Sequence, residues 1–146
     1  MSLANIFDTA ASAMSANTVR LNTTASNLAN AESAASSIDE TYRARHPVFA
    51  AVRQQVEALS FDTLDAGQTE TQGVQVLGIV ESDAPLQQRY EPDHPLANEE
   101  GYVFYPNVNA VEEMTNMISS SKAYQMNVEV MNSAKTMMQR LLTLGQ

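Results

Sequence analysis

Apolar residues recur at alternating three- and four-residue spacing near both ends of this chain. The first run covers residues 3–31 and the second covers residues 110–142. This spacing places side chains on one stripe of a slightly underwound helix, as in coiled coils. Helices of about 29 and 37 residues would be about 43 and 55 Å long, because an α-helix rises 1.5 Å per residue. The pattern predicts two terminal helices that are longer than one small core requires.

The first stripe is weak for a free-standing coiled coil, because Asn17 and Thr24 occupy positions where leucine or isoleucine would be more stabilising. Most helix stability in proteins comes from packing an apolar face. Two interpretations follow: an ordinary helix on the outside of a globule, or a helix that orders only against neighbouring subunits. Asn17, Asn27 and Asn30 either specify register, as buried asparagine does in coiled coils, or lie on a solvated face.

The second helix is expected to begin after Pro106, with Asn107 or Asn109 as its N-cap and Glu112 and Glu113 in its first turn. A second apolar stripe runs beside the main one. Methionine is abundant here, which suits ordinary core packing and also suits contact with non-identical neighbours. The second stripe comprises Val130, Ala134, Met137, Leu141 and Leu144. The predicted assembly interface comprises Leu3, Phe7, Met14, Asn17, Leu21, Leu28, Met114, Met117, Tyr124, Val128, Met131, Met138 and Leu142.

The centre of the chain has the composition of short strands and turns. Residues 30–41 are small and polar without apolar period, which predicts a flexible loop. Residues 46–52 predict an edge strand, since Pro47 cannot donate to a central ladder, and residues 73–80 predict the best strand of the chain. Residues 65–69 predict a turn, and residues 53–65 are ambiguous between helix and strand.

Beyond residue 81 three prolines, Pro85, Pro92 and Pro95, predict that residues 82–96 form no regular element, whereas residues 101–106 predict a short aromatic strand. The expected fold class is α+β, with long N- and C-terminal helices pairing as a coiled-coil-like unit around a small β-rich central domain. Residues 1–31 are the N-terminal helix of the terminal helical domain, 32–106 the linker and β-rich domain, and 107–146 the C-terminal helix.

The composition of the chain excludes several kinds of site and argues against several classes of function. The absence of cysteine excludes disulfides and zinc–thiolate sites. The net charge of -9 and scattered basic residues argue against nucleic-acid binding. Apolar runs stay well below the ~20 residues of a membrane span, and the first residues lack the basic and apolar regions of a secretory signal. We therefore expect a chain that spans no membrane and is exported, if at all, without a cleaved signal peptide.

Candidate chemistry is sparse. His94, with Asp93 and Glu91, is one candidate metal site, but consecutive loop residues seldom converge on one ion, and loop polarity explains them equally well. The sequence contains no G-x-S-x-G elbow and no glycine-rich phosphate loop. The sequence therefore predicts no enzymatic activity, no metal and no cofactor.

Two motifs resemble a known family. Residues 21–31, LNTTASNLANA, are similar to the N-terminal signature of bacterial flagellar axial proteins. Residues 94–109, HPLANEEGYVFYPNVN, resemble the hallmark of the C-type flagellar basal-body rod proteins, which are proximal-rod subunits, and the later segments VEEM, AYQMN and AKTMM extend the match. The resemblance covers about the first 31 and the last 75 residues. The exit from the first helix, Asn30-Ala31-Glu32-Ser33, departs from the usual Asn-Ala-Asn-Thr-like sequence.

The resemblance implies a structural subunit of the flagellar proximal rod. Such a subunit would be exported through the type III flagellar apparatus and would polymerise through its terminal helices with other rod proteins and copies of itself. The product would be the periplasmic drive-shaft around the export channel. The alternatives are another axial protein of the hook or distal-rod type, a secreted helical adaptor or, more remotely, an enzyme.

Overall fold

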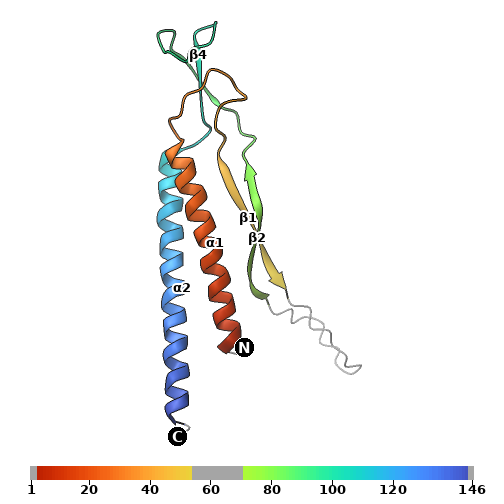
Figure 1. Ribbon diagram of the computed structural model, residues 1–146, viewed down its shortest axis with the longest axis vertical. Coiled ribbons are helices and arrows are strands. Elements are labelled where there is room, and N and C mark those ends of the chain that lie inside the picture. The colour runs from red at the N-terminus through yellow and green to blue at the C-terminus, as the bar shows by residue number, and fades with distance from the viewer. Residues whose placement is uncertain (1–2, 54–70, 145–146) are drawn as a thin grey trace, which may run out of the picture.

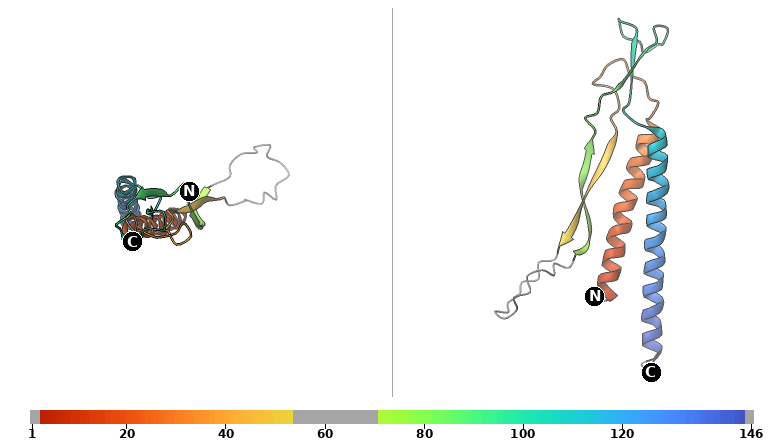
Figure 2. Two further views of the ribbon diagram at one scale, coloured as in Figure 1. Left: turned by 90° about the horizontal axis from the view of Figure 1, so that it is seen from above. Right: turned by 180° about the vertical axis from the view of Figure 1, so that it is seen from behind.

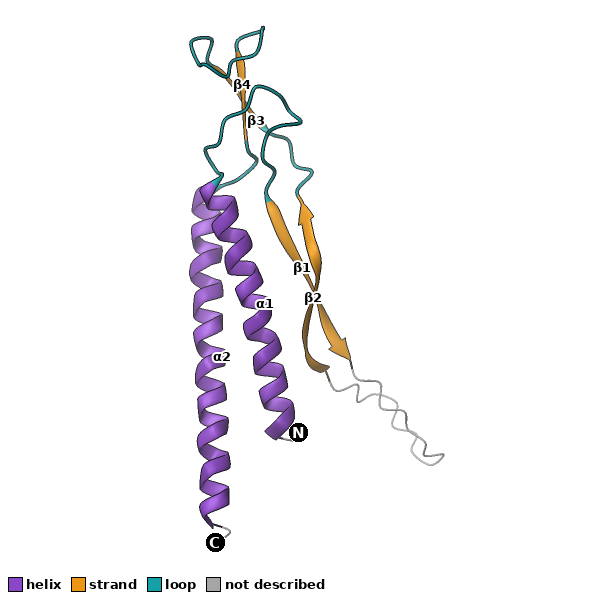
Figure 3. Ribbon diagram, viewed as in Figure 1, coloured by secondary structure: helices purple, strands orange, loops and turns teal. Residues whose placement is uncertain are grey.

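The computed structural model describes residues 3–53 and 71–144, which form two long helices, one long β-hairpin and one short β-hairpin (Figures 1 and 3). This arrangement confirms the α+β class with long terminal helices. The predicted turn at residues 65–69 and nearly all of the ambiguous segment 53–65 lie outside the described residues. The elements are α1 (Leu3–Ala29), β1 (Arg45–Arg53), β2 (Thr71–Glu81), β3 (Gln87–Tyr90), β4 (Tyr102–Tyr105) and α2 (Ala110–Leu144).

The two helices lie side by side and antiparallel, so that the C-terminal end of α1 meets the N-terminal end of α2 (Figures 1 and 2). At this end the Asn27 side-chain amide donates to the Glu113 carboxylate over 3.1 Å. Helix α2 has 35 residues against 27 in α1. The eight additional residues add about 12 Å, so the last turns of α2 extend past the first turn of α1.

The β1–β2 hairpin packs against α1, which therefore lies between the hairpin and α2 (Figure 2). The strands are antiparallel, with Val48 opposite Gly78 and Phe49 opposite Val76. This register leaves Leu77 without a partner, which is a β-bulge. Both predicted strands are confirmed, and Pro47 lies in a two-stranded sheet, where each strand is an edge.

The β3–β4 hairpin lies beyond the end where α1 stops and α2 starts (Figure 1). The prediction that residues 82–96 form no element was wrong for β3, because Pro85 and Pro92 flank the four paired residues instead of interrupting them. The Asn98 side-chain oxygen accepts the backbone N–H groups of Glu100 and Tyr102 and so shapes the turn. Gly101, with φ +81°, leaves no room for a Cβ beside the Tyr90 ring.

The segment between α1 and β1 is a loop, as predicted, but it is held at a defined place. Ala35 and Phe104 exchange two backbone hydrogen bonds of 3.0 Å, so that the loop pairs with β4. Thr41 is buried, and its hydroxyl donates to the Ser37 carbonyl over 2.7 Å. The Ala35–Phe104 pair connects the loop to the short hairpin, and the Thr41 bond closes a turn within the loop.

Small and polar side chains dominate what is buried. Val103 and Phe104 of β4, with Val108, are the large buried hydrophobic residues in the described part of the chain. The other buried apolar side chains are alanines and Pro106, and six polar residues are buried as well. The alanines are Ala10, Ala16, Ala44 and Ala134, and the polar residues are Thr23, Thr24, Asn27, Thr41, Glu113 and Ser120. The side chains that are fully buried on the two long helices are therefore small or polar, whereas the large buried hydrophobic side chains lie in β4 and just after it.

Asn109 is the N-cap of α2, as one of the two predicted alternatives requires. Its side-chain oxygen accepts the backbone N–H groups of Val111 at 3.1 Å and Glu112 at 3.5 Å.

Asn109→Ala should lower the free energy of unfolding by about 1 kcal/mol, because both donors lose their acceptor. Chemical denaturation followed by circular dichroism measures the change. The matched control is Asn132→Ala at an exposed position inside α2, where alanine should be neutral or slightly stabilising; equal losses in both variants would contradict the capping role.

Candidate assembly surface

The face of α2 that packs against α1 carries small and polar residues at seven-residue spacing. Glu113, Ser120 and Ala134 are buried, and Asn127 between them is half-buried. Small side chains at a helix contact allow the two axes to approach closely. Each of these four residues therefore lies one position before a residue of the stripe that the sequence pattern indicated, at positions 114, 121, 128 and 135.

The predicted α2 interface residues divide accordingly. Met117, Val128 and Met131 are half-buried at the edges of the contact line, whereas Met114 and Leu142 are 51% and 68% exposed. Tyr124 and Met138 are exposed to a lesser extent. The structure therefore brings part of the predicted stripe towards α1 and leaves the rest on the outside of the protein.

Helix α1 has two covered faces. On the predicted stripe Ala10 and Thr24 are buried, and the hydrophobic and amide side chains beside them are half-buried: Phe7, Met14, Asn17, Leu21 and Leu28. Leu3 lies in the first turn of α1, and its side chain is outside the described part. The second face meets the long hairpin: the Ser12 hydroxyl accepts the Val74 backbone N–H, and the Arg20 guanidinium lies 4.8 Å from the centre of the Phe49 ring.

Asn27 joins four segments of the chain. Its side-chain amide donates to the Arg45 carbonyl at 2.8 Å and to Glu113 Oε1 at 3.1 Å. Its side-chain oxygen accepts the Arg45 backbone N–H and the Tyr42 hydroxyl, both at 2.9 Å. All four hydrogen-bonding positions of the amide are therefore occupied, at a residue that is 1% exposed. Asn27 fixes the end of α1 relative to the loop, β1 and α2.

The other two asparagines that were candidates for specifying register bond only within their own helix turn. Asn17 donates to the Ala13 carbonyl and Asn30 donates to the Ser26 carbonyl, each at 2.8 Å. Asn107, the second candidate cap, has a different role. Its oxygen accepts the Ala44 backbone N–H, and its amide donates to the Ala84 carbonyl at 2.9 Å, so it ties the two ends of the long hairpin to the start of α2.

Aromatic side chains of the short hairpin pack on the hairpin itself. The Tyr102 and Tyr90 rings meet edge to face at 5.4 Å, and the Arg89 guanidinium lies 4.6 Å from the centre of the Tyr105 ring.

Partial burial raises the pKa of the Tyr105 phenol, and the hydrogen bond that it donates to Glu91 raises it further. The neutral phenol is therefore favoured in the folded state, and this stabilisation is lost as the pH rises through the raised pKa.

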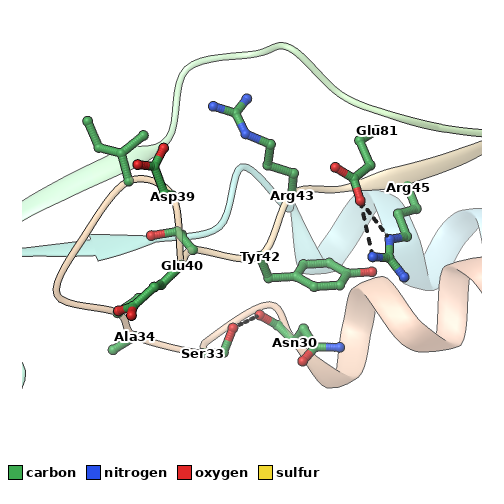
Figure 4. Close-up of a pocket in the computed structure, with 12 residues that line it drawn as sticks. Asn30, Ser33, Ala34, Asp39, Glu40, Tyr42, Arg43, Arg45 and Glu81 are labelled. Carbon is green, nitrogen blue, oxygen red and sulfur yellow. Dashed lines mark hydrogen bonds and ion pairs between the residues drawn. The ribbon is translucent and has the colours of Figure 1, made fainter.

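A polar cavity of about 610 Å³ lies between the 30–43 loop and the Arg45–Glu81 ion pair (Figure 4). The ion pair spans 3.1 Å and is about half exposed on both sides. The Ser33 and Thr41 hydroxyls of this cavity donate to backbone carbonyls, so neither is paired with a general base. His94 accepts the Leu96 backbone N–H in its own turn, and among the residues that the structure describes no three acidic or histidine side chains group as metal ligands would.

Large apolar side chains instead gather on the outside of α2. Exposed apolar patches mark interaction sites on soluble proteins. Met126, Val130 and Met137 line a groove of about 390 Å³ together with Ile6 of α1, the buried Ala134, and the polar residues Glu129 and Ser133. The predicted second stripe therefore divides into a buried Ala134 and exposed neighbours. The exposed apolar residues of α2 are Val111, Met114, Ile118, Tyr124, Met126, Val130, Met137, Met138, Leu141 and Leu142.

Comparison with known proteins identifies the family. The chain is 49% identical to the flagellar basal-body rod protein FlgC of Salmonella typhimurium over 146 residues, which is the full length of both chains. It is 47% identical to FlgC of Yersinia enterocolitica over the full length of both, and 35% identical to FlgC of Borreliella burgdorferi over 100% of this chain and 99% of that one. The chain belongs to the FlgC family of flagellar basal-body rod proteins.

Sequence models of two rod-protein segments match this FlgC-family chain at its helices. The segment described as "Flagella basal body rod protein" matches residues 7–32, and that described as "Flagellar basal body rod FlgEFG protein C-terminal" matches residues 99–144. The expected family and the structural rod role are confirmed, which separates this chain from the hook-type and adaptor alternatives. No described helix has the length and apolar content needed to cross a bilayer.

In this member of the FlgC family, the 94–109 motif builds the turn and the second strand of the short hairpin and the segment that leads into α2. Asn98 and Gly101 shape the hairpin turn, Val103 and Phe104 are buried, and Asn109 caps the helix. Sequence reasoning missed Val111 and Ile118 as exposed apolar residues. Their spacing of seven residues was the available signal, but they lie off the stripe that was followed.

Proposed function

We propose that this rod subunit polymerises with other rod proteins and with copies of itself through its terminal helices, which act together as one terminal helical domain. The outer face of α2 is the main contact surface. The subunit reaches the periplasm through the type III flagellar export apparatus and forms part of the drive-shaft around the export channel. Its role is mechanical, without catalysis.

The observation that carries this proposal is the inverted distribution of side chains on α2. A self-sufficient helix pair buries its large apolar residues between the helices. Here the line towards α1 contains Glu113, Ser120, Asn127 and Ala134, whereas Ile118 is 58% and Leu141 60% exposed. Burial of an exposed leucine or isoleucine stabilises a contact by about 1.5–3 kcal/mol. The free energy available on this face is therefore released only when another subunit covers it.

A second exposed apolar surface supports propagation of the contact. The long hairpin carries Leu77, Ile79 and Val80 at 64%, 54% and 56% exposure. Because α1 lies between the hairpin and α2 (Figure 2), the two surfaces belong to different sides of the subunit. Contacts between unlike surfaces repeat from subunit to subunit and build rings or helical tubes, whereas a contact between like surfaces closes a dimer.

The test places a charge on each apolar patch of α2. Ile118→Asp and Leu141→Asp should each reduce incorporation into purified basal bodies at least about tenfold, because a buried carboxylate replaces a favourable apolar contact. The melting temperature of the purified monomer should change little, since both side chains are exposed. Incorporation is measured by immunoblot of basal bodies from a deletion strain that expresses each variant.

The matched control for Leu141→Asp is Gln139→Asp, which adds the same charge two residues away. At 100° per residue it lies on the opposite flank of the helix, and its side chain is exposed. Gln139→Asp should therefore retain incorporation and swimming. Wild-type incorporation of both Ile118→Asp and Leu141→Asp would overturn the proposal that this face of α2 is an assembly surface.

A further inference from the structure

Four of the six methionines of α2 form two groups by exposure, and the other two, Met114 and Met138, are 51% and 39% exposed and lie outside the groove. Met126 and Met137 are 65% and 60% exposed and line the 390 Å³ groove beside Ile6. Met117 and Met131 are half-buried at the edge of the contact with α1. The chain contains no cysteine, so no thiol competes for an oxidant. Helix α2 thus presents its two most exposed thioethers in one groove, and its two half-buried thioethers provide an internal reference.

We propose that Met126 and Met137 are an oxidation site through which hydrogen peroxide prevents assembly of the free subunit. A lone pair of the thioether sulfur attacks one peroxide oxygen. The O–O bond breaks as the S–O bond forms, and a proton shift to the departing hydroxide releases water. The sulfur is oxidised by two electrons to the sulfoxide, and the peroxide is reduced; no other co-reactant is needed.

The sulfoxide changes the groove without changing the fold. Methionine sulfoxide is polar and chiral, whereas the groove that it would occupy is lined mainly by apolar side chains. These are Ile6, Val130 and Ala134, with Glu129 and Ser133 as the polar lining residues. Both side chains are mostly exposed in the free subunit, so the oxidised monomer remains folded. The cost appears when a neighbouring subunit must cover the polar group. Sulfoxide reductases reverse the modification, which makes the site a switch. This inference rests on the proposed assembly role of α2.

The first test is chemical and independent of assembly. The purified full chain is treated with limiting hydrogen peroxide, and sulfoxide formation is followed at each methionine by peptide mass spectrometry. Met126 and Met137 should oxidise at least about threefold faster than Met117 and Met131, while the circular dichroism spectrum is retained. Equal rates at the four residues, or oxidation only after loss of structure, would overturn the proposal.

The second test separates polarity from shape in cells. Met126→Gln/Met137→Gln gives the groove side chains of similar size with a polar end, whereas Met126→Leu/Met137→Leu keeps them apolar and cannot be oxidised. The glutamine variant should lose incorporation into basal bodies at least about tenfold, and the leucine variant should retain it. Equal incorporation of the two variants, or loss in both, would overturn the switch.

Incorporation of Leu141→Asp, measured in the same strain, shows whether a negative result contradicts the oxidation switch or the assembly surface itself. If Leu141→Asp fails to incorporate while the glutamine variant incorporates normally, the α2 surface stands and the oxidation switch is wrong. If Ile118→Asp and Leu141→Asp both incorporate normally, the assembly surface itself is wrong, whatever the oxidation rates at Met126 and Met137.

Discussion

Asn27→Ala is expected to lower the free energy of unfolding by about 3–5 kcal/mol, because it strips partners from several buried groups at once. The change removes the donor to Glu113, which is 5% exposed, and both the donor and the acceptor of the Arg45 backbone. It also removes the acceptor of the Tyr42 hydroxyl. A loss of this size is a large fraction of the stability of an ordinary domain, about 5–15 kcal/mol.

Urea denaturation of the purified chain, followed by circular dichroism, measures this effect. The matched control is Asn22→Ala on the exposed side of the same helix, which should change stability by less than about 0.5 kcal/mol. If Asn27→Ala unfolds at the same urea concentration as the control, Asn27 does not hold the junction of α1, β1 and α2.

The variant Asn27→Asp keeps the acceptor for Tyr42 and Arg45 but places a carboxylate beside Glu113, where an amide now donates over 3.1 Å. Two adjacent ionised carboxylates repel each other, and protonation of one restores a hydrogen bond between them. The stability deficit of Asn27→Asp relative to the wild type should therefore shrink as the pH falls from 7 to 4. A deficit that stays constant over this range would contradict the contact with Glu113.

The helices could be predicted from sequence because their three-and-four spacing is independent of what they pack against. The side of α2 that packs against α1 could not be predicted in this way. The predicted interface contained the larger apolar side chains, including Met114 and Leu142, because apolar residues usually face the partner helix. In the structure the line of Glu113, Ser120 and Ala134 faces α1 instead, since small residues allow a close approach and Asn27 satisfies the Glu113 carboxylate. Hydrophobic periodicity cannot tell a partner within the chain from a partner in another subunit.

Long-range hydrogen bonds account for most of what the sequence did not reveal. Asn27 was one of three asparagines with the same local pattern. Its side-chain bonds to Tyr42, Arg45 and Glu113, which lie 15, 18 and 86 residues away, distinguish it from Asn17 and Asn30. The pairing of Ala35 with Phe104 likewise has no signature in the 30–41 segment. By contrast, the N-cap Asn109 and the β2 strand depend on neighbours along the chain, and both were predictable.

Gly73→Ala is expected to destabilise the protein by about 2–4 kcal/mol, because the position forbids a side chain on two grounds. Gly73 has φ +114°, which L-residues rarely adopt, and an added Cβ would lie 2.5 Å from the Ser12 hydroxyl oxygen of α1. The next residue, Val74, donates its N–H to that same oxygen. A methyl group at residue 73 therefore forces β2 away from α1 where the hairpin is bonded to the helix. Thermal and urea unfolding measure the loss.

Gly78→Ala in the same strand is the matched control, since an added Cβ there meets nothing within 4 Å. It should be neutral within about 0.5 kcal/mol, as for an ordinary surface substitution. A double-mutant cycle with Ser12→Ala divides the Gly73→Ala effect into its two causes. Removal of the hydroxyl relieves the steric part, with a coupling energy of about 1 kcal/mol, and leaves the backbone strain. If Gly73→Ala and Gly78→Ala are equally stable, the long hairpin does not pack on α1 through Ser12, and its apolar outer surface would not be fixed relative to that of α2.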